Sequence, residues 1–153
     1  FWNSIGPLAL LMFLAAFKPS EPHLTVYLTD ELGFTENQVN DLILTAGPYA
    51  YVVLLPLIGP LAEVLGYRTG ICIGMALRVI TRVLLLATSN LGLMVVMDIT
   101  YAGGLVAETL VYAYVFRVVH REQYRWGTAV ILSSYAFSHV LSGIVGDLLV
   151  NFV

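Results

Sequence analysis

Residues 42–65 read LILTAGPYAYVVLLPLIGPLAEVL, an apolar run whose one charged residue, Glu63, stands near its end. A helix needs about 20 apolar residues to cross the hydrocarbon core of a bilayer, so this run predicts a membrane span. The rest of the chain agrees, because 59% of its 153 residues are apolar, 11% are charged and the mean hydropathy is +0.86. A compact soluble domain of this size cannot bury so much apolar surface. We therefore expect an all-α membrane protein.

Further apolar stretches flank this run. Together they predict five membrane spans, at approximately 2–28, 42–65, 70–88, 91–118 and 128–153. The chain begins without methionine and ends inside an apolar run, so we expect a fragment of a longer protein. A truncated, non-transporting membrane protein that acts through helix contacts is accordingly one of the functions to be weighed.

The charges between the predicted spans set their expected orientation. Arg68 lies between the second and third spans, and Arg121 and Arg125 lie between the fourth and fifth, whereas residues 29–41 are acidic. Loops rich in Lys and Arg stay on the cytoplasmic side of a membrane. We therefore expect the basic loops and the N-terminus to be cytoplasmic and the 29–41 loop to face outside.

Several classes of function find no support in the composition. A net charge of −3 argues against a nucleic-acid partner, which a basic surface would attract. One cysteine and three scattered histidines provide no metal-ligand pattern. The sequence also has no nucleophile–base constellation and no phosphate-binding glycine loop, so we expect neither an enzyme nor a cofactor.

The connection after the 42–65 run reads Gly59-Pro-Leu-Ala-Glu63-Val-Leu-Gly66-Tyr-Arg68. Gly59 favours close helix packing and Gly66 permits a tight turn, while Glu63 is placed to pair with Arg68 or a neighbouring helix end. The alternative is an ordinary cytoplasmic hairpin. The segment resembles the loop signature of the major facilitator superfamily. That resemblance implies twelve spans in two six-helix halves, of which this chain is part of the N-terminal half.

The first predicted span is interrupted by Lys18-Pro19-Ser20-Glu21-Pro22. Prolines remove backbone donors and disfavour helix at the residue before them. Irregular backbone survives at membrane depth where it is buried in protein or faces water, and such breaks often form transporter binding sites. Glu21 is therefore a candidate substrate-binding carboxylate. In the alternative interpretation the helix ends near Phe17 and Glu21 belongs to an external loop.

Six residues of the 91–118 run are spaced three and four apart, which places them on one helix face: Asp98, Tyr101, Leu105, Glu108, Tyr112 and Val115. Carboxylates and tyrosines on one stripe of an otherwise apolar helix indicate a polar cavity face. Glu108 lies near mid-span and is the stronger binding candidate, with Asp98 nearer the outer end. Alternatively, these two carboxylates neutralise Arg78 and Arg82 of the 70–88 run.

The run from Lys18 to Leu28 (Lys-Pro-Ser-Glu-Pro-x-Leu-Thr-x-Tyr-Leu) resembles the hallmark of the reduced folate carrier and thiamine transporter family. Residues 49–51, 108–119 and 145–150 resemble that family's second, fourth and fifth spans. The resemblance implies a vitamin transporter of the plasma membrane that works by alternating access. It implies substrate contacts at Glu21, Glu108, Tyr27 and Tyr112. The sequence leaves the coupling ion open, with a proton or an anion as the candidates.

The charged side chains of the spans leave two substrates open. The family resemblance implies thiamine first, since the thiamine carriers have Glu at the position of Glu108 where the folate carrier has Arg. A buried Glu108 would attract the fixed cation of thiamine and repel a dianion. Arg78 and Arg82 suit instead the glutamate tail of a folate or a phosphorylated solute, although Arg78 is also free to pair internally with Asp98 or Asp147. His139 is a candidate for proton coupling, or a satisfied interior histidine.

Overall fold

The computed structural model describes residues 2–21, 23–87 and 89–152. Within these ranges every regular element is a helix and no strand is present, which confirms the all-α prediction. Pro22 of the predicted break, Thr88 at the end of the third predicted span and Val153 at the end of the fifth lie outside the described residues.

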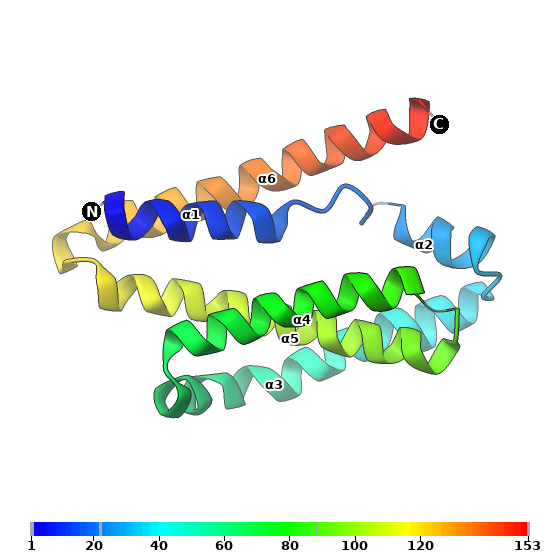
Figure 1. The fold of residues 1–153 in the computed structure, drawn as a ribbon, viewed down its shortest axis with the longest axis horizontal. Helices are drawn as coiled ribbons and strands as arrows, with labels where there is room; N and C mark the ends of the chain where they lie inside the picture. The colour runs from blue at the N-terminus through cyan, green and yellow to red at the C-terminus, as the bar shows by residue number, and fades with distance from the viewer. Residues whose placement is uncertain (1, 22, 88, 153) are drawn as a thin grey trace. The chain divides into compact units, whose positions relative to one another are not determined.

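The helices follow one another along the chain as Figure 1 shows. In order they are α1 (Trp2–Ala16), α2 (Leu24–Val26), the π-helices η1 (Tyr27–Glu31) and η2 (Gln38–Ile43), α3 (Leu44–Leu65), α4 (Tyr67–Ala87), α5 (Leu91–Val118), the 3-10 helix η3 (Arg121–Gln123) and α6 (Tyr124–Phe152). Among the described residues, four helical stretches are long and apolar enough to cross a membrane: Gln38–Leu65, Tyr67–Ala87, Leu91–Val118 and Arg121–Val150. The α1 helix is apolar but shorter, with 15 residues.

The chain divides into two compact units. The first holds the residues before Thr25 and those after Val111, and the second holds Thr25–Val111. The α5 helix contributes its last turns to the first unit and the rest of its length to the second.

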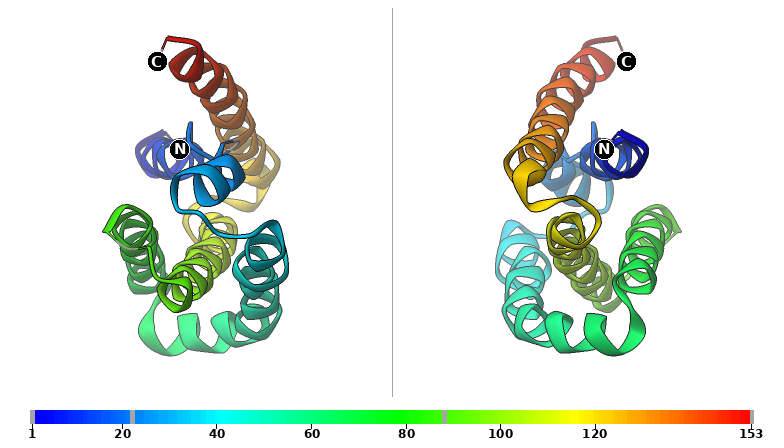
Figure 2. Two further views of the ribbon diagram at one scale, coloured as in Figure 1. Left: turned by 90° about the vertical axis from the view of Figure 1, so that its right-hand side faces the viewer. Right: turned by 90° about the vertical axis from the view of Figure 1, so that its left-hand side faces the viewer.

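In the first unit α1 lies alongside α6, and both helices run in the same direction (Figures 1 and 2). The ring of Phe13 lies 6.2 Å from that of Phe137, and the Ser138 hydroxyl donates a 2.6 Å hydrogen bond to the carbonyl of Phe13. Near the start of both helices, Gly127 of α6 lies against Ile5 of α1. Contacts along the whole of α1 therefore fix its register on α6.

In the second unit small residues bring α4 and α5 close together. A Cβ atom at Gly74 would collide with the side chain of Ala107, and a Cβ at Gly103 would approach a methyl of Leu77 to 2.8 Å. Small residues at such contacts let the backbones of apolar helices approach, which is how membrane helices gain packing energy. The packing of α4 on α5 in turn fixes where the α4 side chains meet those of α5.

The connection between α3 and α4 explains part of the loop signature. Gly66 has φ +88°, a conformation that residues with side chains rarely adopt, so glycine is required for this turn. Glu63 and Arg68 are exposed beside it. A Cβ at Gly59 would meet no atom within 4 Å, so close packing at Gly59, which the sequence favoured, does not occur among the described residues.

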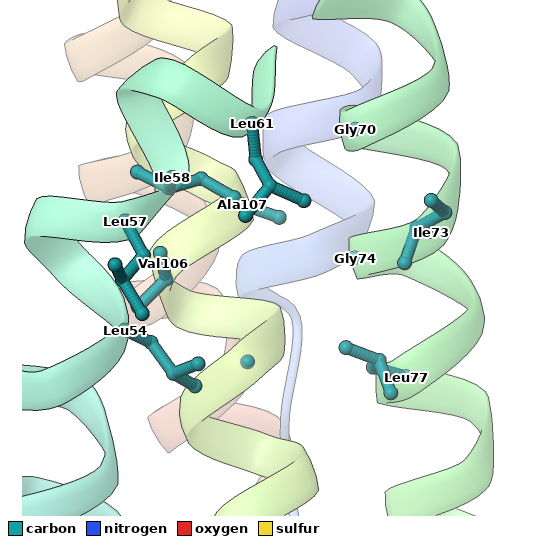
Figure 3. A pocket seen from close by; sticks show the side chains of 11 residues that line it. Leu54, Leu57, Ile58, Leu61, Gly70, Ile73, Gly74, Leu77, Val106 and Ala107 are labelled. Carbon is teal, nitrogen blue, oxygen red and sulfur yellow. The ribbon is translucent and has the colours of Figure 1, made fainter. Parts of the chain in front are cut away.

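A cavity of about 170 Å³ opens between α3, α4 and α5 (Figure 3). Its walls are apolar, with Leu57 and Leu61 from α3, Ile73 and Leu77 from α4 and Val106 from α5. Ligand sites usually combine an apolar wall with a few polar groups that orient the ligand. This cavity lacks such groups, so the charged residues considered next are better candidates for a substrate site.

Candidate functional site

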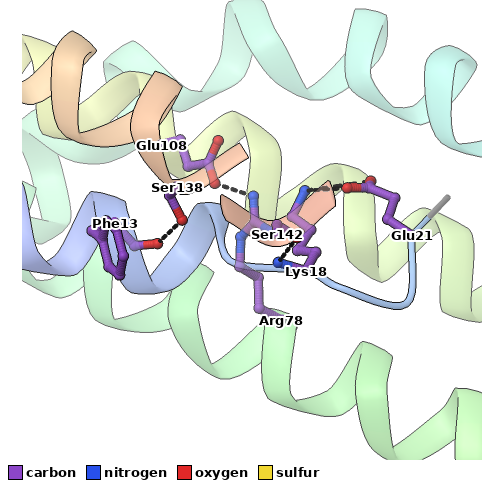
Figure 4. Close-up of polar contacts among 7 residues, drawn as sticks. All are labelled: Phe13, Lys18, Glu21, Arg78, Glu108, Ser138 and Ser142. Atoms are coloured by element: carbon purple, nitrogen blue, oxygen red, sulfur yellow. Dashed lines mark hydrogen bonds and ion pairs between the residues drawn. The ribbon is translucent and has the colours of Figure 1, made fainter. Parts of the chain in front are cut away.

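The predicted break in the first span is present. The α1 helix ends at Ala16 and α2 begins at Leu24, with a turn between them in which the Glu21 N–H donates to the carbonyl of Lys18 at 3.1 Å. The buried N–H of Lys18 donates to Oγ of Ser142 on α6 at 2.8 Å (Figure 4). Because the helix ends before Lys18, the Lys18 N–H no longer donates to a carbonyl four residues back along the chain, and the Ser142 hydroxyl of α6 is its acceptor instead.

Glu21 is paired with a cation of its own segment. The Lys18 ammonium lies 3.4 Å from each carboxylate oxygen of Glu21 (Figure 4). The Lys18 side chain is 4% exposed, whereas that of Glu21 is 38% exposed. The pair therefore presents its carboxylate outward and keeps its ammonium buried.

Small residues of α6 allow the end of α1 and the turn after it to pack against α6, and the predictions from the sequence did not include them. Ser138, Ser142 and Gly146 recur every four residues, which places them on one helix face. A Cβ at Gly146 would lie 2.5 Å from the carbonyl oxygen of Pro19. The signal available in the sequence was this four-residue spacing of small residues, which is typical of close helix contacts in membranes.

Replacing Ser142 with alanine is expected to destabilise the break. The change leaves a buried N–H without its acceptor, which costs about 1–3 kcal/mol. Thermal unfolding of the purified full-length protein in detergent measures the loss. Ser133→Ala, an exposed serine of the same helix, is the matched control. Equal unfolding midpoints for the two variants contradict a structural role for the Ser142 hydroxyl.

In the second unit the carboxylate of Glu108 on α5 is bonded to the guanidinium of Arg78 on α4 (Figure 4). Both side chains are largely buried, with 8% and 12% exposure respectively. The Arg78 guanidinium also lies 5.6 Å from the centre of the Tyr101 ring, within cation–π range. A Cβ at Gly104 would lie 2.7 Å from the Arg78 stem, so this glycine makes room for the arginine.

Asp98, the other carboxylate of the stripe, has a different partner. Its Oδ2 accepts a 2.5 Å hydrogen bond from the N–H of Gly47, and no ion pair of Asp98 is present among the described residues. The Gly47 amide lies where η2 gives way to α3, just before Pro48, which has no N–H to donate. Asp98 therefore binds an irregular helix start.

These contacts decide between the pairings that the sequence left open. Arg78 pairs with Glu108, as the structural interpretation of the stripe expected. The expectation that Arg78 pairs with Asp98 or Asp147 is wrong, because Gly74 and Ala107 set the packing of α4 at a level where Arg78 meets Glu108. Asp147 is exposed and lies 3.7 Å from His23.

The remaining predicted residues differ in burial and in the unit to which they belong. Tyr27 is half-buried in η1 of the second unit, and Tyr112 is half-buried in the part of α5 that belongs to the first unit. Arg82 is half-buried one turn after Arg78, and His139 is exposed with its ring 4.6 Å from that of Tyr135. Each of these residues has the exposure of a wall or rim position rather than a core position.

The carboxylates of the stripe do not form one cluster. Asp98 and Glu108 are ten residues apart on α5, which separates them by roughly 15 Å at 1.5 Å per residue. Within the described parts of the chain, no three His, Cys, Asp or Glu side chains converge as a metal site requires. The first unit thus offers the Lys18–Glu21 pair, and the second unit offers the Arg78–Glu108 pair, each by itself a charged contact for a ligand.

Comparisons with known proteins agree with the resemblance seen in the sequence. The sequence pattern of the reduced folate carrier family matches residues 2–153. A folate-like transporter of Dictyostelium discoideum is 35% identical over 139 residues, which cover 91% of this chain and 25% of that protein. Thiamine transporter 2 of Homo sapiens is 30% identical over 146 residues, which cover 92% of this chain and 29% of the transporter.

The reduced folate transporter of Mus musculus is 27% identical over 132 residues, which cover 86% of this chain and 25% of that protein. The chain therefore spans between a quarter and a third of the length of these relatives. Thiamine and folate transporters both stand among them, at similar levels of identity.

Proposed function

We propose that this chain, which belongs to the reduced folate carrier family, is the N-terminal part of a multi-pass carrier that moves a vitamin across a membrane by alternating access. The observation that carries the proposal is the buried pair of Glu108 with Arg78 on helices long and apolar enough to span a bilayer. Ionisable side chains at such positions are costly, and in membrane proteins they usually mark a substrate or ion pathway. The proposed activity is transport rather than catalysis.

The first candidate substrate is thiamine. In this proposal Glu108 and Glu21 bind the positive part of the vitamin, with Asp98 as a more distant carboxylate. Tyr27 and Tyr112 are the aromatic walls, each contributing roughly 0.5–2 kcal/mol if it lies over the cation. The half-buried state of both tyrosines leaves part of each ring accessible.

The second candidate is a reduced folate, and the observed ion pairs favour it. Lys18 and Arg78 neutralise the two proposed substrate carboxylates, so neither acts as an isolated negative charge. Taken separately, each pair offers a folate a carboxylate that accepts from its ring N–H groups and a cation that binds one of its carboxylates. Charge-assisted bonds of this kind are stronger than neutral ones, and arginine binds carboxylates with two parallel donors.

The proposal also covers the membrane in which the protein lies, its orientation in that membrane and the ion that drives transport. We place the carrier in the plasma membrane, as the family resemblance implies. We place its N-terminus in the cytoplasm because Arg68, Arg121 and Arg125 then lie on the cytoplasmic side. A proton or an anion drives uptake. The exposed His139 is the candidate for a proton in this chain.

Uptake by the complete parent protein tests the proposal. In cells that lack vitamin carriers, labelled thiamine and a labelled reduced folate are supplied separately, each with and without excess unlabelled vitamin. We expect saturable, self-competed uptake of at least one of them. If neither label enters while the protein is present at the cell surface, the proposal is wrong and the non-transporting alternative gains support.

A further inference from the structure

Arg78 places a positive charge on the carboxylate that the proposed function uses to bind substrate. The Arg78–Glu108 contact is built into the packing of α4 on α5, because Gly74 allows the close approach and Gly104 accommodates the arginine stem. Figure 4 shows the guanidinium directed at the carboxylate from the neighbouring helix. The contact is therefore a property of the folded second unit.

This pairing changes what Glu108 offers to a solute. The charges of Arg78 and Glu108 cancel, so an incoming cation meets a neutral pair instead of a free carboxylate. A cation that takes the Glu108 oxygen bonded to Arg78 displaces the guanidinium from that oxygen, and the buried guanidinium loses this contact with its counter-charge. Breaking one side of a buried pair is strongly unfavourable.

A solute with both a donor and an anionic group avoids this cost. Its cationic or N–H group bonds to Glu108 while its phosphate or carboxylate bonds to Arg78, so each broken contact is replaced by one of the same kind. We propose that Arg78 is a specificity-determining residue, which makes the Glu108 site select amphoteric solutes over simple cations. This inference rests on the proposed function and adds the substrate class to it.

Arg78 has a second contact, which can hold its guanidinium while Glu108 exchanges Arg78 for the donor group of a solute. Its guanidinium lies 5.6 Å from the ring centre of Tyr101, one helical turn from Asp98 and two turns from Glu108 on α5. A cation–π contact holds an arginine without neutralising it. The guanidinium thus stays in place, still charged, when Glu108 turns to the donor group of a solute.

Two probes that differ by a single phosphate isolate the effect. Thiamine and thiamine monophosphate carry the same fixed cation, and the complete carrier is tested for inhibition of labelled vitamin uptake by each. We expect wild type to prefer the phosphate ester by about tenfold or more, the range of one charge-assisted contact. Arg78→Gln is expected to abolish this preference, and Arg78→Lys to retain part of it.

The matched control is Arg125→Gln, which removes the same side chain from an exposed position of α6. It is expected to keep the wild-type ratio of the two inhibition constants. An unchanged ratio in Arg78→Gln, at normal surface expression, overturns the proposal. So does a wild type that binds thiamine as well as its phosphate ester.

Stabilisation of the purified carrier by each probe separates this inference from the proposed function. If wild type takes up no vitamin but is protected against heat more by the phosphate ester than by thiamine, transport fails and the role of Arg78 stands. If Arg78→Gln does not fold, the double variant Arg78→Gln with Glu108→Gln removes both charges together. In that neutral background the two probes are expected to protect equally, and a retained preference for the ester refutes the assignment.

Discussion

Glu108→Gln in the complete carrier is expected to lower vitamin uptake at least about thirtyfold, because losing one partner of a buried, hydrogen-bonded charge pair at a binding contact costs about 2–5 kcal/mol and 1.4 kcal/mol corresponds to a factor of ten. The substitution keeps the shape of the side chain and removes its charge. Arg78 then remains buried on α4 without its counter-charge, and the solute loses the carboxylate that binds its donor group. Initial uptake rates, normalised to protein at the cell surface, measure the effect.

Glu122→Gln makes the same chemical change at an exposed position in η3 and is the control for this variant. It is expected to transport like wild type, because an exposed charge contributes little to stability and is far from either ion pair in sequence. If Glu108→Gln transports within about twofold of wild type, a range worth less than 0.5 kcal/mol, Glu108 binds no substrate and the site must be sought elsewhere.

The second large effect concerns the contact between α4 and α5. Gly74→Val is expected to prevent correct folding, because even one added carbon would collide with the side chain of Ala107 and lie 3.4 Å from its Cα atom. Overpacking of a fitted interface typically costs about 1–3 kcal/mol, and here the clashing atom is the Cβ of Ala107, which no side-chain rotation can move away. The same displacement moves Arg78 away from Glu108, so stability and transport are lost together.

The yield of monodisperse carrier in detergent and its thermal midpoint measure this loss. Gly143→Val on α6 is the control, because a Cβ at Gly143 meets no atom within 4 Å. The control is expected to purify like wild type. Equal yields and midpoints for the two valine variants would show that α4 and α5 do not approach each other at Gly74.

Much of the helical structure was predictable from the order of apolar and polar residues. The α5 helix begins at Leu91 and ends at Val118, the bounds of the fourth predicted span, because the polar residues Ser89 and Asn90 precede it and His120 follows it. The break after Ala16 followed from Pro19, which cannot continue a helix. That these helices cross a bilayer stays a prediction from their length and composition.

The partners of the charged residues were less predictable. The helical repeat places Asp98 and Glu108 on one face of α5. It does not predict how the neighbouring helix α4 is rotated about its own axis or shifted along α5. Arg78 and Arg82 are one turn apart on α4, so either was a reasonable partner for Glu108. The choice depends on Gly74, whose close contact with Ala107 sets the height of α4, and that contact is a property of the folded chain.

The role of α6 was hidden for a similar reason. Ser138, Ser142 and Gly146 bond or pack against the α1 segment more than a hundred residues away in the chain. The spacing of small residues marks a contact face but does not say which helix meets it. The structural role of the Ser142 hydroxyl follows from its partner, the Lys18 N–H just after α1, which the sequence does not identify.

Equilibrium binding to the purified complete carrier tests the central claim most directly. Labelled thiamine and a labelled reduced folate are each titrated against wild type and Glu108→Gln, with the fold of the variant checked by its circular dichroism spectrum. We predict saturable binding of at least one vitamin to wild type and its loss in the variant. Equal affinity of the two proteins for the vitamin that binds would contradict the account, since the carboxylate paired with Arg78 would then play no part in holding the substrate.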